Sequence, residues 1–209
     1  MSTPGSSTDI QVIGMAEFFR NALHAAASKY KLILTPHAEC YLVNLMTGYS
    51  RTEAYFERTS NGGVKPPLLT VLLSQALSAD NPREQERSMQ RLGDVALFTV
   101  GFFAHGFSRK IVDVDYYVAM GGNAYATLSD RARTPGLCTI RPVFAELAKK
   151  FVPIMDALNE LSDTAHTPST DDLLRYYEMW LKTGSPRSYK KLIEAGLSPV
   201  AGNAPLSRQ

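Results

Sequence analysis

Cysteine is scarce in this chain, which has only Cys40 and Cys138 among its 209 residues. The two lie far apart in the sequence, form no Cys-x-x-Cys motif and lack the spacing of metal ligands. This pattern speaks against a disulfide framework and against a structural zinc site. Because free cysteine is among the most frequently buried residue types, we predict two reduced thiols in the core of a cytoplasmic protein.

An excess of charge of either sign is also missing. The chain has 22 Lys+Arg and 20 Asp+Glu, a formal net charge of +2, which is too mild to indicate nucleic-acid binding. Its most apolar run, residues 95–104, is about half the ~20 residues of a membrane-spanning helix. The first residues, MSTPGSST, have neither the basic nor the apolar region of a signal peptide. The sequence thus predicts a cytoplasmic protein without a nucleic-acid partner or a membrane span.

Metal and cofactor motifs are absent from the sequence. The four histidines are isolated, and there is no Glu-x-x-His pair and no His-Glu-x-x-His motif. Gly121-Gly122 lacks the preceding strand and the following Lys-Ser/Thr of a phosphate-binding loop. We therefore predict no metal and no cofactor.

What the chain has in abundance is helix periodicity with clear helix starts. Apolar residues recur at spacings of three and four, beginning with Val12 to Tyr30. Thr35-Pro36, Asn81-Pro82 and Ser185-Pro186 each combine an N-cap residue with Pro at the first helical position. These features predict an all-α fold, an irregular single-domain bundle of about seven or eight helices over residues 9–197. Polar tails, residues 1–8 and 198–209, are predicted to be disordered.

Several local signals make sharper predictions. Ser50-Arg-Thr-Glu53 is a capping box that predicts a short helix ending by Asn61. Residues 129–139 are expected to form a loop. The apolar seam from Phe144 to Leu161 predicts one long helix, which Pro153 should kink or split.

The stretch from Arg91 to Ala126 is expected to form the centre of the fold. Its first half is apolar on nearly every face, as in a buried helix, and residues 86–128 are predicted to form a central helical hairpin. In its second half, small residues such as Gly121 allow close helix packing, or else Gly121-Gly122 interrupts the helix. The first alternative is the more common.

His105 is the first candidate catalytic residue, because it is embedded among large apolar side chains. A hairpin could bring its imidazole near Asp115 and Tyr116, with Asp113 and Tyr117 beside them, for general acid–base chemistry. The more common role of such a histidine is to cap a helix C-terminus.

Two further patterns carry alternative interpretations. His37 and Cys40 could form an activated thiol, but a buried structural cysteine beside a surface histidine is the more common arrangement. Arg83, Arg87 and Arg91 could bind phosphate or an acidic partner. With Glu84 and Glu86 between them, a solvated mixed-charge face is the simpler interpretation.

An aromatic cluster near the C-terminus, Tyr176, Tyr177 and Trp180 with Tyr189, is the candidate partner-binding site. Tyr and Trp are frequent hot-spot residues in interfaces, although such clusters also close cores. Our main functional hypothesis is a non-catalytic adaptor or regulatory protein that acts by protein–protein interaction. The alternative is a small-molecule-binding protein or enzyme with a pocket around His105, Asp115 and Tyr116, between the central hairpin and the first helices. Homo-oligomerisation is left open.

Overall fold

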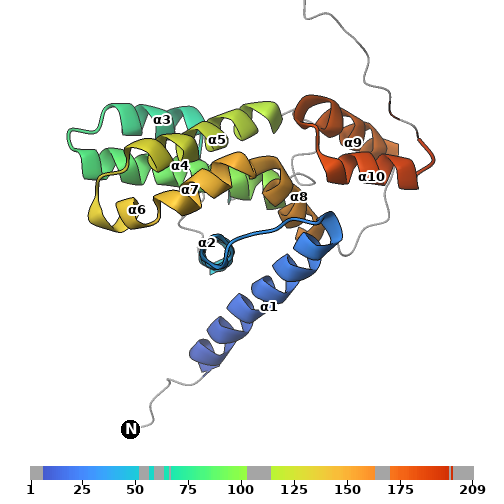
Figure 1. The fold of residues 1–209 in the computed structure, drawn as a ribbon, viewed down its shortest axis with the longest axis horizontal. Helices are drawn as coiled ribbons and strands as arrows, with labels where there is room; N and C mark the ends of the chain where they lie inside the picture. The colour runs from blue at the N-terminus through green and yellow to red at the C-terminus, as the bar shows by residue number, and fades with distance from the viewer. Residues whose placement is uncertain are drawn as a thin grey trace, which may run out of the picture.

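The structure is a computed structural model, which describes residues 7–51, 57–58, 64–65, 67–102, 114–162, 170–197 and 199 (Figure 1). Over these residues the chain forms ten α-helices and one antiparallel pair of two-residue strands. The prediction of an all-α fold is confirmed, with more helices than the seven or eight expected. The predicted disordered tails lie largely outside the described residues.

The elements follow one another along the chain with short connections. The helices are α1 (Ser7–Tyr30), α2 (Pro36–Arg51), α3 (Leu69–Leu77), α4 (Pro82–Phe102), α5 (Val114–Arg131), α6 (Pro135–Thr139), α7 (Arg141–Lys149), α8 (Phe151–Ser162), α9 (Thr170–Thr183) and α10 (Pro186–Glu194). The strands are β1 (Glu57–Arg58) and β2 (Val64–Lys65).

The predicted N-caps are in place. Asn81 Oδ1 accepts from the backbone N–H of Glu84 at 2.8 Å, and Ser185 Oγ accepts from that of Ser188 at 3.0 Å. Thr35 Oγ1 accepts more weakly from Ala38, at 3.3 Å. Each cap satisfies a backbone donor that the first helical turn leaves without a partner.

Helix α4 is the centre of the core, as its apolar sequence predicts. Every residue from Leu92 to Gly101 is buried except Asp94, which is partly buried. Helices α2, α3, α5 and α8 pack around α4, and α7 packs against α5 (Figure 1). Helix α1 contacts α2 and α8, and its N-terminal part projects away from the body of the molecule (Figure 1). A helix surrounded on all sides can place a polar residue where water hardly reaches it.

The apolar seam from Phe144 to Leu161 is divided between two helices, and the division lies just before Pro153. Helix α7 ends at Lys149 and α8 begins at Phe151, so Pro153 lies in the first turn of α8. In that turn the missing N–H costs nothing, whereas in a continuous helix the ring would clash with the preceding turn. The prediction of a kink or split is therefore confirmed.

Two local predictions are wrong. Residues 129–139 are not one loop, because α5 continues to Arg131 and the Pro135-Gly136 stretch starts the short helix α6. The helix expected from Ser50 to Asn61 does not form as such. Helix α2 runs on through Arg51, and Glu57–Arg58 pairs with Val64–Lys65 as strand β1.

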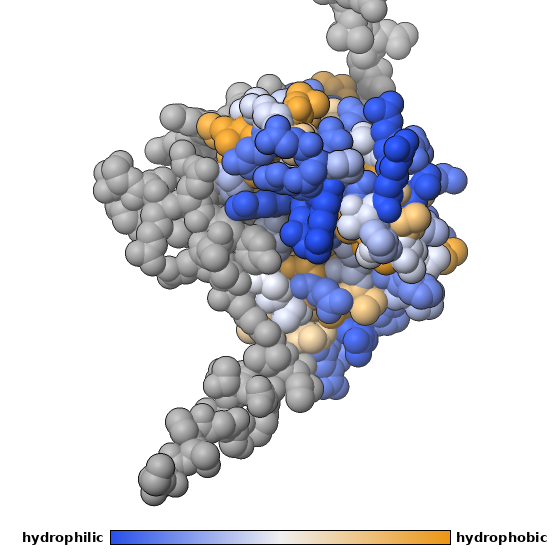
Figure 2. All heavy atoms as spheres, turned by 90° about the vertical axis from the view of Figure 1, so that its left-hand side faces the viewer, coloured by the Kyte–Doolittle hydropathy of each residue, from blue (hydrophilic) through white to orange (hydrophobic). Residues whose placement is uncertain are grey.

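The surface turned away from α9 and α10 is mainly hydrophilic. Figure 2 shows the side of the molecule with α6 and the α3–α4 connection, where apolar side chains occur only in small separate groups among the described residues. Across the described helices, none is both long and apolar enough to span a membrane.

Candidate functional site

The predicted acid–base trio is not assembled in the part of the chain that the structure describes. His105 and Asp113 lie outside the described residues. Asp115 and Tyr116 are in the first turn of α5, and both are exposed. The carboxylate of Asp115 faces Lys182 of α9 at 4.0 Å, and Tyr116 packs edge-on against the buried Tyr117. The role of His105 stays a prediction.

The prediction of buried thiols is wrong. Cys40 and Cys138 are both free, as expected, but both are exposed. Cys40 lies on the outer side of α2, nearly opposite the buried Ala38 and Leu42, which are each two residues away from it along the helix. His37 is exposed, as predicted. The apolar neighbours of Cys40 in the sequence suggested the core side, but the buried stripe of α2 is centred on Ala38, Leu42, Leu45 and Tyr49, and Cys40 lies on the opposite face of the helix.

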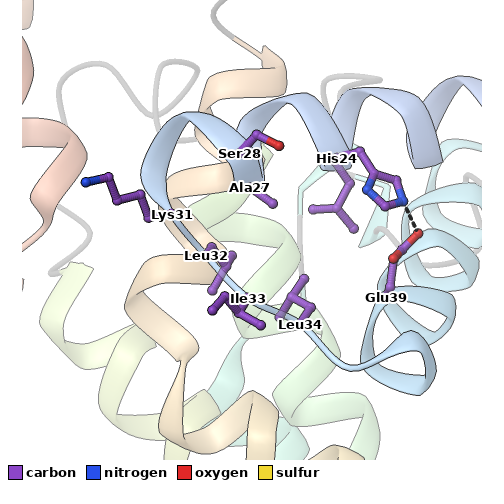
Figure 3. A pocket seen from close by; sticks show the side chains of 9 residues that line it. His24, Ala27, Ser28, Lys31, Leu32, Ile33, Leu34 and Glu39 are labelled. Carbon is purple, nitrogen blue, oxygen red and sulfur yellow. Dashed lines mark ion pairs between the residues drawn. The ribbon is translucent and has the colours of Figure 1, made fainter.

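One pocket lies where the end of α1 and the 31–34 connection meet the start of α2 (Figure 3). Its volume is about 390 Å³, and its wall is largely apolar, with Leu23, Leu32 and Leu34 among the lining residues. At its rim His24 Nε2 and Glu39 Oε1 are 2.7 Å apart (Figure 3). These two polar groups satisfy each other, which leaves little to orient a ligand.

A second pocket, of about 320 Å³, lies between α2 and α4. Helix α2 contributes Leu45, Gly48 and Tyr49, and α4 contributes a more polar set. The lining is completed by Asn44 of α2 and by the polar residues of α4, which are Arg87, Gln90, Arg91 and Asp94. We call this space the α2–α4 pocket. It lies between α4 and the first helices, as the alternative hypothesis expected of a pocket, but its residues are not those that the hypothesis named.

Asp94 is the most unusual residue in the α2–α4 pocket. Its Oδ1 accepts hydrogen bonds from the hydroxyls of Tyr41 at 2.6 Å and Tyr125 at 2.7 Å. Gln90 Nε2 in turn donates to the Tyr41 hydroxyl at 3.0 Å. The Tyr125 ring reaches this place because Gly93 has no side chain, since a Cβ there would lie 2.7 Å from the ring. Three helices thus converge on one carboxyl group.

Burial raises the pKa of Asp94 from 3.8 to about 6, and the two tyrosine hydroxyls offset only part of that shift. In return, burial and the nearby carboxylate raise the pKa of both Tyr41 and Tyr125. The tyrosines therefore stay protonated and act as donors at neutral pH. Sequence reasoning missed Asp94, although one carboxylate inside the apolar run of α4 was a usable signal.

This raised pKa predicts how stability changes with pH. As pH rises from about 4 to 7, the unfolded state gives up the Asp94 proton first, so the folded state loses stability. A shift of about two pKa units corresponds to at most ~3 kcal/mol, and we expect about 2 because Asp94 is only partly buried. The measurement is urea denaturation of wild type and Asp94→Asn at pH 4 and pH 7. Between pH 4 and pH 7, the free energy of unfolding of Asp94→Asn should rise by about 2 kcal/mol relative to that of wild type. Parallel pH profiles would contradict the assignment.

The acidic residues expected to neutralise the arginines of α4 are engaged elsewhere. Glu84 bonds to its N-cap residue Asn81, at 3.3 Å. Glu86 is buried and accepts from the backbone N–H groups of Arg133 at 2.6 Å and Thr134 at 3.0 Å. These bonds outweigh burial and lower the pKa of Glu86. The expected solvated face is present, because Arg83, Glu84, Arg87 and Arg91 are exposed, but Glu86 is buried and does not belong to it.

The C-terminal aromatic cluster divides between core and surface. Tyr176 is buried, with its ring 5.5 Å from the Arg187 guanidinium. Tyr177 is exposed and Trp180 is partly buried; their ring centroids are 5.9 Å apart, and Trp180 contacts Tyr189 of α10 at the same distance. Four aliphatic side chains on α9, on α10 and just after α10 are also exposed: Leu174, Leu181, Ile193 and Leu197. We call Leu174, Tyr177, Trp180, Leu181, Tyr189 and Ile193 the α9–α10 face.

A buried polar network fixes α10 to α8 beneath this face. Asp156 of α8 accepts from the Ser185 hydroxyl at 2.6 Å and from the Arg187 backbone N–H at 3.0 Å. Arg187 Nε reaches Glu160 at 3.2 Å, and Glu160 also pairs with Lys29 of α1. These cationic and hydroxyl partners together lower the pKa of Glu160 despite its burial. These bonds hold the first turn of α10, the helix that contributes Tyr189 and Ile193 to the face, on α8.

No metal site accompanies these features within the residues that the structure describes, where no group of three or more His, Cys, Asp or Glu side chains is placed to hold an ion. Comparison with known proteins adds no assignment: no family model, no curated protein and no solved structure matches this chain.

Proposed function

We propose that this protein is a cytoplasmic adaptor or regulatory protein, and that its α9–α10 face binds another protein. The observation that carries the proposal is the exposure of large apolar side chains on that face. Leu174 is 63% exposed, Leu181 54% and Ile193 45%, and each is three or four residues along its helix from the exposed Tyr177 or Tyr189, whose rings contact Trp180. Apolar surface gathered around aromatic rings is typical of a binding site, whereas single exposed leucines are ordinary.

The shape of the face favours an amphipathic helix as its occupant. Helices α9 and α10 are antiparallel neighbours joined at Gly184-Ser185, and they lie side by side at one end of the molecule (Figure 1). A third helix can pack an apolar stripe across two such helices. The exposed charges nearby, Glu178, Lys190 and Glu194, are of both signs and supply the polar rim of a reversible interface.

The polar network at the start of α10 supports the same conclusion. The Asp156–Ser185–Arg187 network fixes the start of α10, so the partner need not order these helices on binding. Preorganisation of this kind removes part of the entropic cost of association. The cytoplasmic location is supported by the two exposed thiols, which are unpaired.

A charge placed on the face should abolish binding without unfolding the chain. We expect Leu181→Glu to weaken the partner complex at least about tenfold, because it buries a carboxylate among apolar side chains. The matched control is Leu77→Glu, since Leu77 is also an exposed leucine near a helix end, 68% exposed on α3. Both variants should keep the stability of wild type.

The partner can be identified by photo-crosslinking in the native host. A benzophenone amino acid at position 181 should give a crosslinked product that the same probe at position 77 does not give. The captured protein is then purified, and its affinity for wild type, Leu181→Glu and Leu77→Glu is measured. Equal affinities for all three would refute the role of the α9–α10 face. A product formed by two copies of this chain would replace the adaptor with a homodimer.

A further inference from the structure

We propose that the α2–α4 pocket binds a small organic dianion, a dicarboxylate or a phosphate compound, that also carries one hydroxyl or ammonium group. In this arrangement Arg87 and Arg91 receive the anionic end, and Asp94 receives the hydrogen-bond donor. The site is independent of the α9–α10 face, because none of its lining residues belongs to α9 or α10.

The two arginines of the pocket are exposed and available to a ligand. Neither Arg87 nor Arg91 forms an ion pair in the described part of the chain. Glu84 and Glu86, which precede them on α4, bond to Asn81 and to the Arg133–Thr134 backbone. A guanidinium binds a carboxylate or a phosphate through two parallel hydrogen bonds. Two such groups, one helical turn apart, suit an anion with two negative charges.

The floor of the pocket offers an acceptor. Both tyrosine hydroxyls donate to Oδ1 of Asp94, and Oδ2 has no hydrogen bond among the residues described. The bonds from Tyr41 and Tyr125 fix the orientation of this carboxyl group, with Gln90 fixing Tyr41. A carboxylate that is oriented, lines a cavity and keeps one oxygen free is built to receive a donor from a ligand.

The dimensions set the size of the ligand. Residues 87, 91 and 94 share one face of α4, and Arg91 and Asp94 are about 4.5 Å apart along the helix axis. A volume of about 320 Å³ holds a compound with a few carbon atoms, and Leu45 and Tyr49 offer it an apolar wall. A Cβ on Gly48 would meet no atom within 4 Å, so a larger side chain at this lining position would extend into open space.

The test is a calorimetric titration of the full chain at low ionic strength and pH 7.5. The probes are succinate, L-malate and L-aspartate, which differ only in carrying a hydrogen, a hydroxyl or an ammonium group at one carbon, together with inorganic phosphate. We expect L-aspartate to bind at least about tenfold more tightly than succinate, with L-malate between them. In Asp94→Asn this preference should disappear, because the ammonium group loses its carboxylate.

Two further variants separate the pocket from nonspecific charge. Arg87→Gln should weaken every probe about tenfold or more. Gly48→Leu should abolish binding while it leaves every charge in place, and it should fold well because leucine is a better helix former than glycine. Binding of phosphate in preference to the dicarboxylates would assign the site to phosphate compounds. No binding of any probe below about 10 mM, or undiminished binding to Gly48→Leu, would overturn the proposal.

Discussion

Replacing Asp156 with alanine is expected to destabilise the fold by about 3 kcal/mol, the largest loss that we expect from a single polar side chain. Asp156 is 1% exposed, and its two oxygens accept from the Ser185 hydroxyl and the Arg187 backbone N–H at 2.6 and 3.0 Å. Alanine leaves both donors buried without this acceptor. Urea denaturation followed by circular dichroism measures the loss.

The matched variant is Asp156→Asn, which keeps one acceptor oxygen at the same place. Burial raises the pKa of Asp156 even though Ser185 and Arg187 favour its charged form, so a neutral isostere avoids part of the desolvation cost. We expect Asp156→Asn to lose about half as much stability as Asp156→Ala. If Asp156→Ala lost less than about 1 kcal/mol, the network would not be what holds α10 on α8.

This network also links stability to the proposed function. Asp156 lies in α8 beneath α10 and is not part of the α9–α10 face. A loosened α10 would present Tyr189 and Ile193 less rigidly, so Asp156→Ala should weaken partner binding without touching the partner.

The second large effect distinguishes two adjacent glycines of α5. A Cβ on Gly121 would lie 2.6 Å from the Phe151 ring and 2.8 Å from the Ala96 Cβ, whereas a Cβ on Gly122 would meet nothing within 4 Å. Gly121→Ala should therefore cost about 2 kcal/mol, because Ala96 on α4 cannot move aside. Gly122→Ala should stabilise the protein by about 0.5–1 kcal/mol through helix propensity alone.

The pair is its own control, because the two substitutions are chemically identical and one residue apart. Thermal unfolding of both variants gives the sign directly. Equal shifts in Tm would contradict the close approach of α4 and α5 at Gly121. The outcome also tests the sequence-based choice between close packing and a helix interrupted at Gly121-Gly122, for which the structure has a continuous helix.

Features determined by neighbouring residues were predictable from the sequence. The caps at Asn81 and Ser185 depend on contacts three residues away, and the split before Pro153 depends on the proline ring itself. The burial of α4 followed from apolar residues on all its faces. Each of these properties is local, so periodicity and propensity suffice.

Features that depend on distant partners were not predictable. Asp94 lies 53 residues from Tyr41 and 31 from Tyr125, and no local pattern indicates that these side chains meet. Nor could spacing alone tell that Tyr176 turns toward Arg187 while Tyr177 turns outward. For the same reason Cys40 was assigned to the wrong side of α2: a rotation of the helix by part of a turn decides which residues it buries.

The most direct test of the proposed function is a native mass spectrum of the protein purified gently from its own host, as wild type and as Leu181→Glu. We expect the wild-type spectrum to contain this chain together with one other protein, and the Leu181→Glu spectrum to contain the chain alone. A wild-type chain without any protein partner, or a complex that survives Leu181→Glu unchanged, would contradict binding through the α9–α10 face.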